Sequence, residues 1–219
     1  MITALWLVSA LSALVYGALW VLGPVSPLRT VVKMVPVAAL ALIAYLTGPQ
    51  QGLALLLPAA LALSAVGDGF LAGDPKRWLP LGLASFLLAH LIYVALFWSV
   101  GATSALSEPI RPILIGAAAI SGVGMLTWLW PHLGAMRGAV SAYVAAIVAM
   151  LATSLLLPWT AWPVMVGAAA FMASDAILSA DLFRGARLAG SERLSGYAIW
   201  GLYYGGQAAI ALGLMSLSL

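Results

Sequence analysis

Two aspartates lie inside long apolar segments of the sequence, where an ionisable side chain is costly. Asp68 lies in the segment 52–72 and Asp175 in the segment 162–183. An Asp at the centre of a membrane-spanning helix costs roughly 2.5–3.5 kcal/mol on insertion scales. Each carboxylate could still form a purely structural ion pair, with Lys33 as the nearest candidate partner of Asp68. Because such a residue is rarely kept without a use, we predict that both carboxylates are functional.

Other polar side chains lie within the apolar segments at a similar depth to the aspartates. With a helical rise of ~1.5 Å per residue, they fall between roughly 6 and 18 Å from one common end of the segments. They come from six different segments: Lys33, Asp68, His90, Tyr143, Asp175 and Gln207. Their shared depth predicts a polar cavity that opens toward one leaflet of the membrane.

Two of these segments carry polar and aromatic side chains on a single helix face. In the segment 78–99, the residues of that face are spaced by four, three and four positions: Phe86, His90, Tyr93 and Phe97. Tyr203 and Gln207 share a face of the segment 195–217, with Tyr204 beside it. Each residue alone is explained equally well by interhelical packing or hydrogen bonding. Together they suit an amphiphile, which has a polar head and an apolar chain.

A pair of buried carboxylates limits the chemistry to a few classes. In different environments, one carboxylic acid can donate a proton while its ionised partner accepts one. This arrangement suits acid-catalysed cleavage through an oxocarbenium ion. It suits proton coupling in a transporter of a small amphiphile or lipid equally well. A membrane scaffold is a third alternative, but it leaves the cost of two intramembrane aspartates unexplained.

Several other kinds of site are excluded by the residues that the chain lacks. Without cysteine it has no thiolate nucleophile, disulfide or Cys-based metal site. Its two histidines cannot form a three-His zinc site, and it has no His-Glu-x-x-His motif. Gly-x-Ser-x-Gly and Walker motifs are also missing from the sequence. We therefore predict a site without a metal or another cofactor.

The composition is that of a polytopic membrane protein. Of the 219 residues, 64% are hydrophobic and 7% charged, whereas soluble domains carry about 25% charged residues. No stretch is polar enough for a separate soluble domain, so we predict one transmembrane domain over residues 1–219. The net charge of +3 is spread over short loops, which does not indicate binding to nucleic acid.

Eight segments are long and apolar enough to cross a bilayer, which takes about 20 residues in a helix. They are separated by Pro, Gly or charged residues and cover 3–22, 30–47, 52–72, 78–99, 110–130, 136–157, 162–183 and 195–217. No basic region precedes the first segment, so we expect a retained helix there instead of a cleaved signal. The predicted fold is an all-α bundle of eight transmembrane helices.

The distribution of Lys and Arg predicts the orientation of this bundle. Seven of the nine cations lie in the loops that follow the odd-numbered segments, whereas Arg111 is alone on the other side and Lys33 lies within a segment. The positive-inside rule places the seven in the cytoplasm and both termini outside. We therefore expect a bacterial inner-membrane protein whose polar cavity faces the cytoplasmic leaflet.

A weak internal repeat relates the two aspartates. The stretch 67–74 aligns with the stretch 174–181, and both lie near the same end of their segments. Four predicted helices separate them, so a parallel four-plus-four duplication is one interpretation. Chance similarity between short apolar stretches is the other, and the sequence alone leaves both open.

Several short motifs follow one another along the chain in a recognisable order. They are Lys33-x-x-Pro36, Ser64-Ala65-Val66-Gly67-Asp68-x-x-Leu71, Phe86-x-x-Ala89-His90-Leu91-x-Tyr93-x-x-Phe97, Ala142-Tyr143 with Met150, Ser174-Asp175-x-x-Leu178, and Tyr203-Tyr204-x-x-Gln207. In these motifs the sequence resembles the lysoplasmalogenase (YhhN-like) family of eight-helix membrane hydrolases. The resemblance covers nearly the whole chain, although the segment 3–22 carries no diagnostic residue.

The resemblance implies a hydrolase that cleaves the vinyl ether bond of lysoplasmalogens without a metal. Its partners would be a lysophospholipid substrate and membrane lipids. It implies acid–base roles for Asp68 and Asp175, with either one as the acid, and a phosphate contact for Lys33. The remaining motif residues would position substrate and water: His90, Tyr93, Tyr143, Ser174, Tyr203, Tyr204 and Gln207. The headgroup, the physiological substrate and the oligomeric state stay open.

Overall fold

The computed structural model describes residues 1–217, with the backbone alone for residues 75 and 76. Over this range the chain forms eight long α-helices: α1 (Ile2–Leu19), α2 (Pro27–Thr47), α3 (Leu56–Ala72), α4 (Pro75–Val100), α5 (Ile110–Leu129), α6 (Arg137–Ser154), α7 (Trp162–Arg184) and α8 (Glu192–Met215). Short 3-10 turns join several of them, and the described residues contain no strand. The prediction of an all-α bundle of eight helices is confirmed.

Most of these helices can cross a membrane. Seven spans in the described range, formed by α1 to α7, are long and apolar enough to do so. Helix α8 is as long, but its Ser, Gly, Tyr and Gln residues make it more polar. Several of these face the bundle interior, because Ser195, Tyr203, Gly206 and Gln207 are buried. The chain is therefore an integral multi-pass membrane protein.

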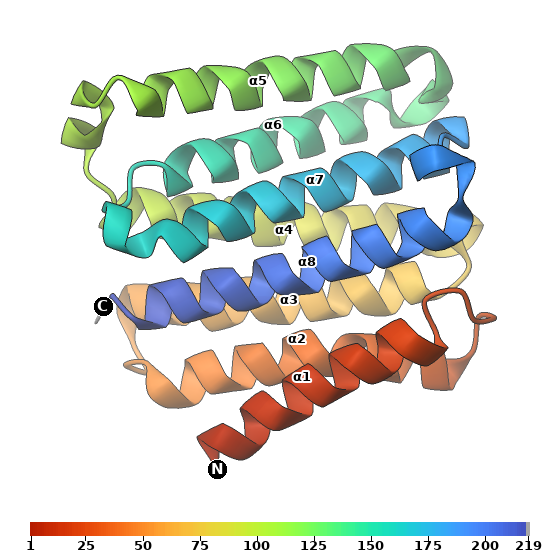
Figure 1. Cartoon of the computed structure of the whole chain (residues 1–219), viewed down its shortest axis with the longest axis horizontal. Helices are drawn as coiled ribbons and strands as arrows, with labels where there is room; N and C mark the ends of the chain where they lie inside the picture. Colours follow the sequence, from red (N-terminus) through yellow and green to blue (C-terminus); the bar gives the residue numbers. More distant parts are fainter. Residues whose placement is uncertain (218–219) are drawn as a thin grey trace.

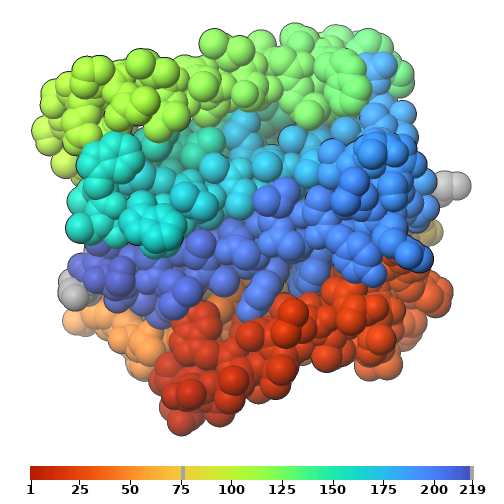
Figure 2. Space-filling view, viewed as in Figure 1, coloured from red at the N-terminus to blue at the C-terminus, as the bar shows by residue number. Residues whose placement is uncertain are grey.

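The helices run antiparallel, with both termini at one end of the bundle (Figure 1). At the other end lie the loops that join α1 to α2, α3 to α4, α5 to α6 and α7 to α8, and this end is called the loop end below. Helices α1, α8, α7 and α5 form one face of the molecule (Figure 2). The predicted cation-rich connections are these four loops.

Contacts between helices follow the same order in the two halves of the chain. Each helix packs on the next within α1–α4 and within α5–α8, and the halves meet mainly through α4 with α6 and α2 with α8, with a smaller contact between α1 and α8. If the halves were duplicates, α4 would correspond to α8 and α6 to α2, so these two contacts would be equivalent. The four-plus-four duplication stays a prediction, which this pattern supports.

Glycines allow α7 and α8 to approach closely. A Cβ atom at Gly167 would lie 2.6 Å from the carbonyl oxygen of Gly206, and one at Gly206 would lie 2.8 Å from the carbonyl oxygen of Gly167. Neither position has room for a side chain, which is how small residues bring membrane helices together. This contact holds Ser174 and Asp175 on α7 near Tyr203 on α8.

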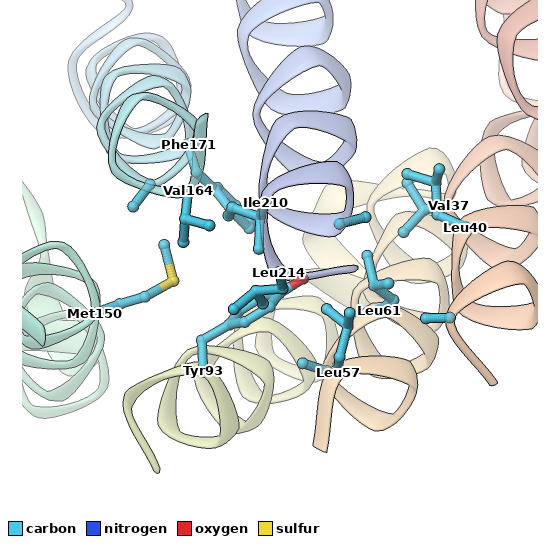
Figure 3. Close-up of a cluster of buried hydrophobic side chains, with 14 of the residues drawn as sticks. Val37, Leu40, Leu57, Leu61, Tyr93, Met150, Val164, Phe171, Ile210 and Leu214 are labelled. Carbon is cyan, nitrogen blue, oxygen red and sulfur yellow. The ribbon is translucent and has the colours of Figure 1, made fainter. Parts of the chain in front are cut away.

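Buried apolar side chains fill the interior of the bundle (Figure 3). This core is built from α2, α3, α4, α6, α7 and α8, whose buried side chains converge there: Val37, Leu40, Leu57, Leu61, Tyr93, Met150, Val164, Phe171, Ile210 and Leu214. A cavity lined by charged residues lies toward the loop end. The same end carries both intramembrane aspartates.

Candidate active site

Asp68 on α3 lies in a fully satisfied polar environment. Its side chain is only 1% exposed, and the Nζ atom of Lys33 on α2 lies 3.5 Å from its Oδ1 atom. The hydroxyl of Tyr203 on α8 donates a hydrogen bond of 2.6 Å to its Oδ2 atom. A cation and a neutral donor therefore both stabilise the ionised carboxylate. The Lys33 side chain is 15% exposed, so its ammonium group reaches water as well.

Asp175 on α7 has a different set of partners. The hydroxyl of Tyr143 on α6 donates a hydrogen bond of 2.5 Å to its Oδ2 atom. Asp175 is partly exposed, and the ion pairs within 4.0 Å among the described side chains do not include it. It still lies close enough to Asp68 and Lys33 to interact with both electrostatically. Unlike Asp68, it therefore has a neutral phenol but no cation within ion-pair distance among the described side chains.

Both carboxylates line one cavity at the loop end, with a volume of about 230 Å³. This polar cavity, cavity 1, also has Ser174, Tyr203 and Trp200 in its wall. Arg29 and Lys33 contribute cations to it, and Asp181 and Glu192 contribute anions near the mouth.

The two anions at the mouth are tied together by one arginine. The Nε atom of Arg187 lies 2.9 Å from Asp181, and its Nη1 atom lies 3.2 Å from Glu192. Burial at the mouth is low, so these ion pairs are worth little stability. Asp181 therefore lies on the rim of the cavity.

A second cavity of about 180 Å³, cavity 2, lies against the first and is apolar. Its wall includes Leu83, Met125, Ile147 and Phe183, with Tyr143 among them. The two cavities share a set of lining residues: Leu71, Leu79, Phe86, Asp175, Leu178 and Leu182. Asp175 is the charged member of this set. Its carboxylate therefore borders a polar space on one side and an apolar space on the other.

Three further candidate residues, His90, Tyr93 and Gln207, are buried and do not line either cavity. The Tyr93 hydroxyl donates a hydrogen bond of 2.7 Å to the Oε1 atom of Gln207. The His90 Nδ1 atom lies 2.6 Å from the carbonyl oxygen of Phe86, so this nitrogen carries the proton. The other ring nitrogen and the Gln207 amide nitrogen are buried without a protein partner. The His90 ring packs on Tyr143, with 5.1 Å between ring centroids.

The hydroxyl groups of two other predicted residues, Ser174 and Tyr204, are hydrogen-bonded to protein atoms. The hydroxyl of Ser174 lines cavity 1 but donates a hydrogen bond of 2.9 Å to the carbonyl oxygen of Ile199. The Tyr204 hydroxyl lies 2.9 Å from that of Ser9 on α1, which in turn donates to the carbonyl oxygen of Pro36. Tyr204 thus joins α8 to α1 and α2 and is not among the residues that line the cavities.

The structure therefore divides the candidate residues into two groups. Lys33, Asp68, Ser174, Asp175 and Tyr203 line cavity 1, and Tyr143 lines cavity 2. The other four do not line these cavities and are hydrogen-bonded to other protein groups: His90, Tyr93, Tyr204 and Gln207.

Sequence reasoning missed Arg29 and Trp200 in the cavity wall, as well as Asp181 and Glu192 near its mouth. Arg29 counted only as a loop cation, and Trp200 lies one turn before Tyr204 on α8. The signal for Arg29 was its place one turn before Lys33, on the same side of α2.

The chemistry available to this arrangement is that of two carboxylates in unequal surroundings. Among the described residues, no three His, Asp or Glu side chains lie close enough together to hold a metal ion. The carboxylate paired with Lys33 favours the ionised form, whereas the one that borders apolar space and has no cation within ion-pair distance holds a proton more readily. One group can donate a proton while the other accepts one.

The comparison with known proteins agrees with the motifs that lead to this site. The model of the YhhN family matches residues 28–214. The chain belongs to this family. Every candidate residue named above, from Lys33 to Gln207, lies inside the matched range.

Two individual relatives are both named lysoplasmalogenase. A lysoplasmalogenase of Mycobacterium tuberculosis is 37% identical over 161 residues, which cover 70% of this chain and 58% of that protein. Lysoplasmalogenase TMEM86B of Homo sapiens is 35% identical over 176 residues, 79% of this chain and 72% of the human protein. The chain thus matches less than two thirds of the mycobacterial relative's length. No solved structure matches it.

Proposed function

We propose that this protein hydrolyses the vinyl ether bond of lysoplasmalogens to a fatty aldehyde and glycerophosphoethanolamine or glycerophosphocholine. The names of relatives in the YhhN family support this substrate class. The observation that carries the proposal is the position of Asp175 in the wall shared by a polar and an apolar cavity. The vinyl ether bond lies at the same junction in the substrate, between the polar headgroup and the hydrocarbon chain.

The cavities suit the two ends of such a substrate. The phosphate group binds beside Arg29 and Lys33 in cavity 1, where the two cations offset its charge. The hydrocarbon chain enters cavity 2, whose wall is apolar except for Tyr143, Asp175 and two serines. This placement brings the vinyl ether carbons to the Asp175 carboxyl group.

Asp175 is the proton donor in this proposal. Its nearest partner is the neutral Tyr143, whereas Lys33 holds Asp68 in the ionised form. Protonated Asp175 gives its proton to the vinyl carbon farther from the ether oxygen. The electron pair of the double bond forms the new C–H bond, and an oxygen lone pair stabilises the neighbouring carbon as an oxocarbenium ion.

Asp68 acts on water in the second half of the reaction. Its carboxylate takes a proton from a water molecule while the water oxygen attacks the oxocarbenium carbon, and a neutral hemiacetal forms. The hemiacetal hydroxyl then loses a proton as the ether oxygen gains one. The C–O bond breaks, and aldehyde and glycerol hydroxyl are released. A proton passes from Asp68 back to Asp175 and restores the starting state.

The membrane orientation belongs to the same proposal. The cation-rich loops at the loop end support a cytoplasmic location for the mouth of cavity 1 and an outside location for both termini. We propose that the protein lies in a bacterial inner membrane and takes its substrate from the cytoplasmic leaflet. Reporter fusions to the two termini test this orientation, and a cytoplasmic terminus would contradict it.

Product analysis tests the activity directly. The purified protein in detergent is incubated with a lysoplasmalogen and, separately, with the ester-linked lysophospholipid of the same headgroup and chain length. Mass spectrometry should find fatty aldehyde and the glycerophosphodiester from the first lipid, without any ion gradient. Equal cleavage of the ester-linked lipid, or no aldehyde at all, would overturn the proposal.

A further inference from the structure

A third cavity, groove 3, runs along the membrane-facing side of α5 and α7. It has a volume of about 550 Å³, and its wall comes from α5, α6 and α7 and from the turn before α7. Figure 2 shows α5 and α7 on this face, on either side of the more deeply set α6. Several wall residues are exposed, among them Val166, Ala169 and Ala173, so the groove is open to the lipid.

Groove 3 continues cavity 2. Ser121 on α5 and Met172 and Ala176 on α7 line both spaces. Cavity 2 in turn shares Asp175 with the polar cavity 1. The three spaces therefore follow one another from the charged mouth, past the carboxylate, to the lipid-facing surface.

This path is long enough to hold a whole hydrocarbon chain. Along α7, thirteen residues separate Asp175 from Trp162 at the far end of the groove. At ~1.5 Å per residue they span roughly 20 Å. The hydrocarbon chains of one leaflet occupy about half of a ~30 Å bilayer core, roughly 15 Å.

The chemistry of the wall matches such a chain as well. Its polar side chains are confined to Ser121 and the two tryptophans near the end, Trp159 and Trp162. Small residues leave the space open, since Ala117, Ala118 and Ala169 line the groove.

We propose that groove 3 holds the distal part of the substrate's hydrocarbon chain and sets which chain lengths the protein accepts. The proposal rests on the proposed function in one respect, because it takes the reacting bond to lie at Asp175. The chain runs from cavity 2 past Ser121 into the groove between α5 and α7. A lipid of the surrounding bilayer is the competing occupant, and the experiments below separate the two.

Photolabelling tests the binding site without requiring turnover. The probe is a lysophosphatidylcholine with a diazirine at the end of its hydrocarbon chain, added to the full chain in nanodiscs. After irradiation, mass spectrometry should find the label on α5 and α7, near Ser121, Ala169 and Trp162. Excess unlabelled lysophospholipid should remove this label. Label on α1 or α2, or label that only bilayer phospholipid displaces, would overturn the proposal.

Chain-length selectivity provides the second test. Ser121→Leu blocks the junction, and Ala169→Leu narrows the groove farther from Asp175. Both residues are exposed, so neither change overpacks the bundle. The ratio of kcat/KM for long chains to that for short chains should fall roughly 10-fold in Ser121→Leu, as expected for a blocked apolar pocket. Ala169→Leu should lower it less and only for the longest chains.

A matched control lies on the same helix. Ala119 on α5 is exposed and lines none of the cavities described above, so Ala119→Leu should leave the ratio unchanged. An unchanged ratio in Ser121→Leu, or an equal loss for all chain lengths, would contradict the proposal. If the wild-type protein cleaves no lysoplasmalogen, the proposed function fails, and the photolabel alone decides whether groove 3 binds the chain.

Discussion

The surroundings of Asp68 and Asp175 differ although the sequence around them is similar. Asp68 has a cation at 3.5 Å and a phenol at 2.6 Å, and it is almost fully buried. Asp175 has a phenol at 2.5 Å, lies at the edge of an apolar cavity and is partly exposed. Two similar motifs can thus supply unequal carboxylates when neighbouring helices bring different partners.

The partners come from corresponding places in the two halves of the chain. Lys33 reaches Asp68 from the second helix of the first half, and Tyr143 reaches Asp175 from the second helix of the second half. In the predicted duplication, one position would thus have received a cation and the other a phenol. In the mechanism proposed above, this exchange separates the ionised carboxylate from the proton donor.

The largest effects are expected from removing either carboxylate. Asp175→Asn should lower kcat by about 10²–10⁴-fold, the usual contribution of a general acid, with little change in thermal stability. Asp68→Asn should lose as much activity and also stability, by up to about 3 kcal/mol, because Lys33 is left without its partner. Turnover of lysoplasmalogen measures the activity of the two variants, and thermal unfolding in detergent measures their stability.

The control for these variants is Asp74→Asn, at the loop before α4, where Asn replaces Asp without a change of shape. It should keep normal activity. Normal turnover in either Asp68→Asn or Asp175→Asn would refute the two-carboxylate scheme. Equal stability of these two variants would refute the contrast between their surroundings.

Removing the cation should have the next largest effect. Lys33→Met leaves Asp68 without its charged partner, so the ionised carboxylate loses stabilisation, and the substrate loses a phosphate contact. We expect kcat/KM to fall by about 10–100-fold, since hydrogen bonds to charged groups are worth ~1.5–3 kcal/mol. Lys33→Arg should recover part of it. Steady-state kinetics check this, and full activity of Lys33→Met would count against an ion-paired base.

The two tyrosines test the contrast most sharply. Tyr143→Phe removes the hydrogen bond that Asp175 receives, and kcat should fall roughly 10-fold. Tyr203→Phe removes one of two partners of Asp68, and Lys33 remains. For Tyr203→Phe, kcat should fall only about threefold, which corresponds to well under the ~1.4 kcal/mol of a tenfold change. The reverse order of the two effects would mean that Asp68, and not Asp175, depends on its phenol for proton donation.

The smallest effects on activity are expected for Tyr204 and Ser174, whose hydroxyl groups are hydrogen-bonded to protein atoms. Tyr204→Phe breaks its contact with Ser9, and Ser174→Ala breaks a bond to the backbone of α8. Each should lower stability by about 1 kcal/mol and change KM by less than about twofold, below ~0.5 kcal/mol. Thermal unfolding and the KM for lysoplasmalogen separate these outcomes. A large rise in KM for Ser174→Ala would place its hydroxyl on the substrate instead.

The helices and the depth of the polar residues could be predicted from the sequence alone. Hydropathy and helical rise are local properties, so the segments 52–72 and 162–183 and the positions of Asp68 and Asp175 within them follow directly. The predicted helix limits agree with the observed ones to within a few residues; α3, for example, ends at Ala72. The face shared by His90 and Tyr93 follows from the same periodicity.

Which polar side chains contact one another could not be predicted without the packing of the helices. Depth and helix face leave open which helices are neighbours, and that depends on contacts between residues far apart in sequence, such as Gly167 with Gly206. For this reason the sequence did not distinguish Ser174, at the cavity wall, from Tyr204, which bonds to Ser9. The same contacts bring Lys33 to Asp68 and Tyr143 to Asp175, and so make two similar motifs unequal.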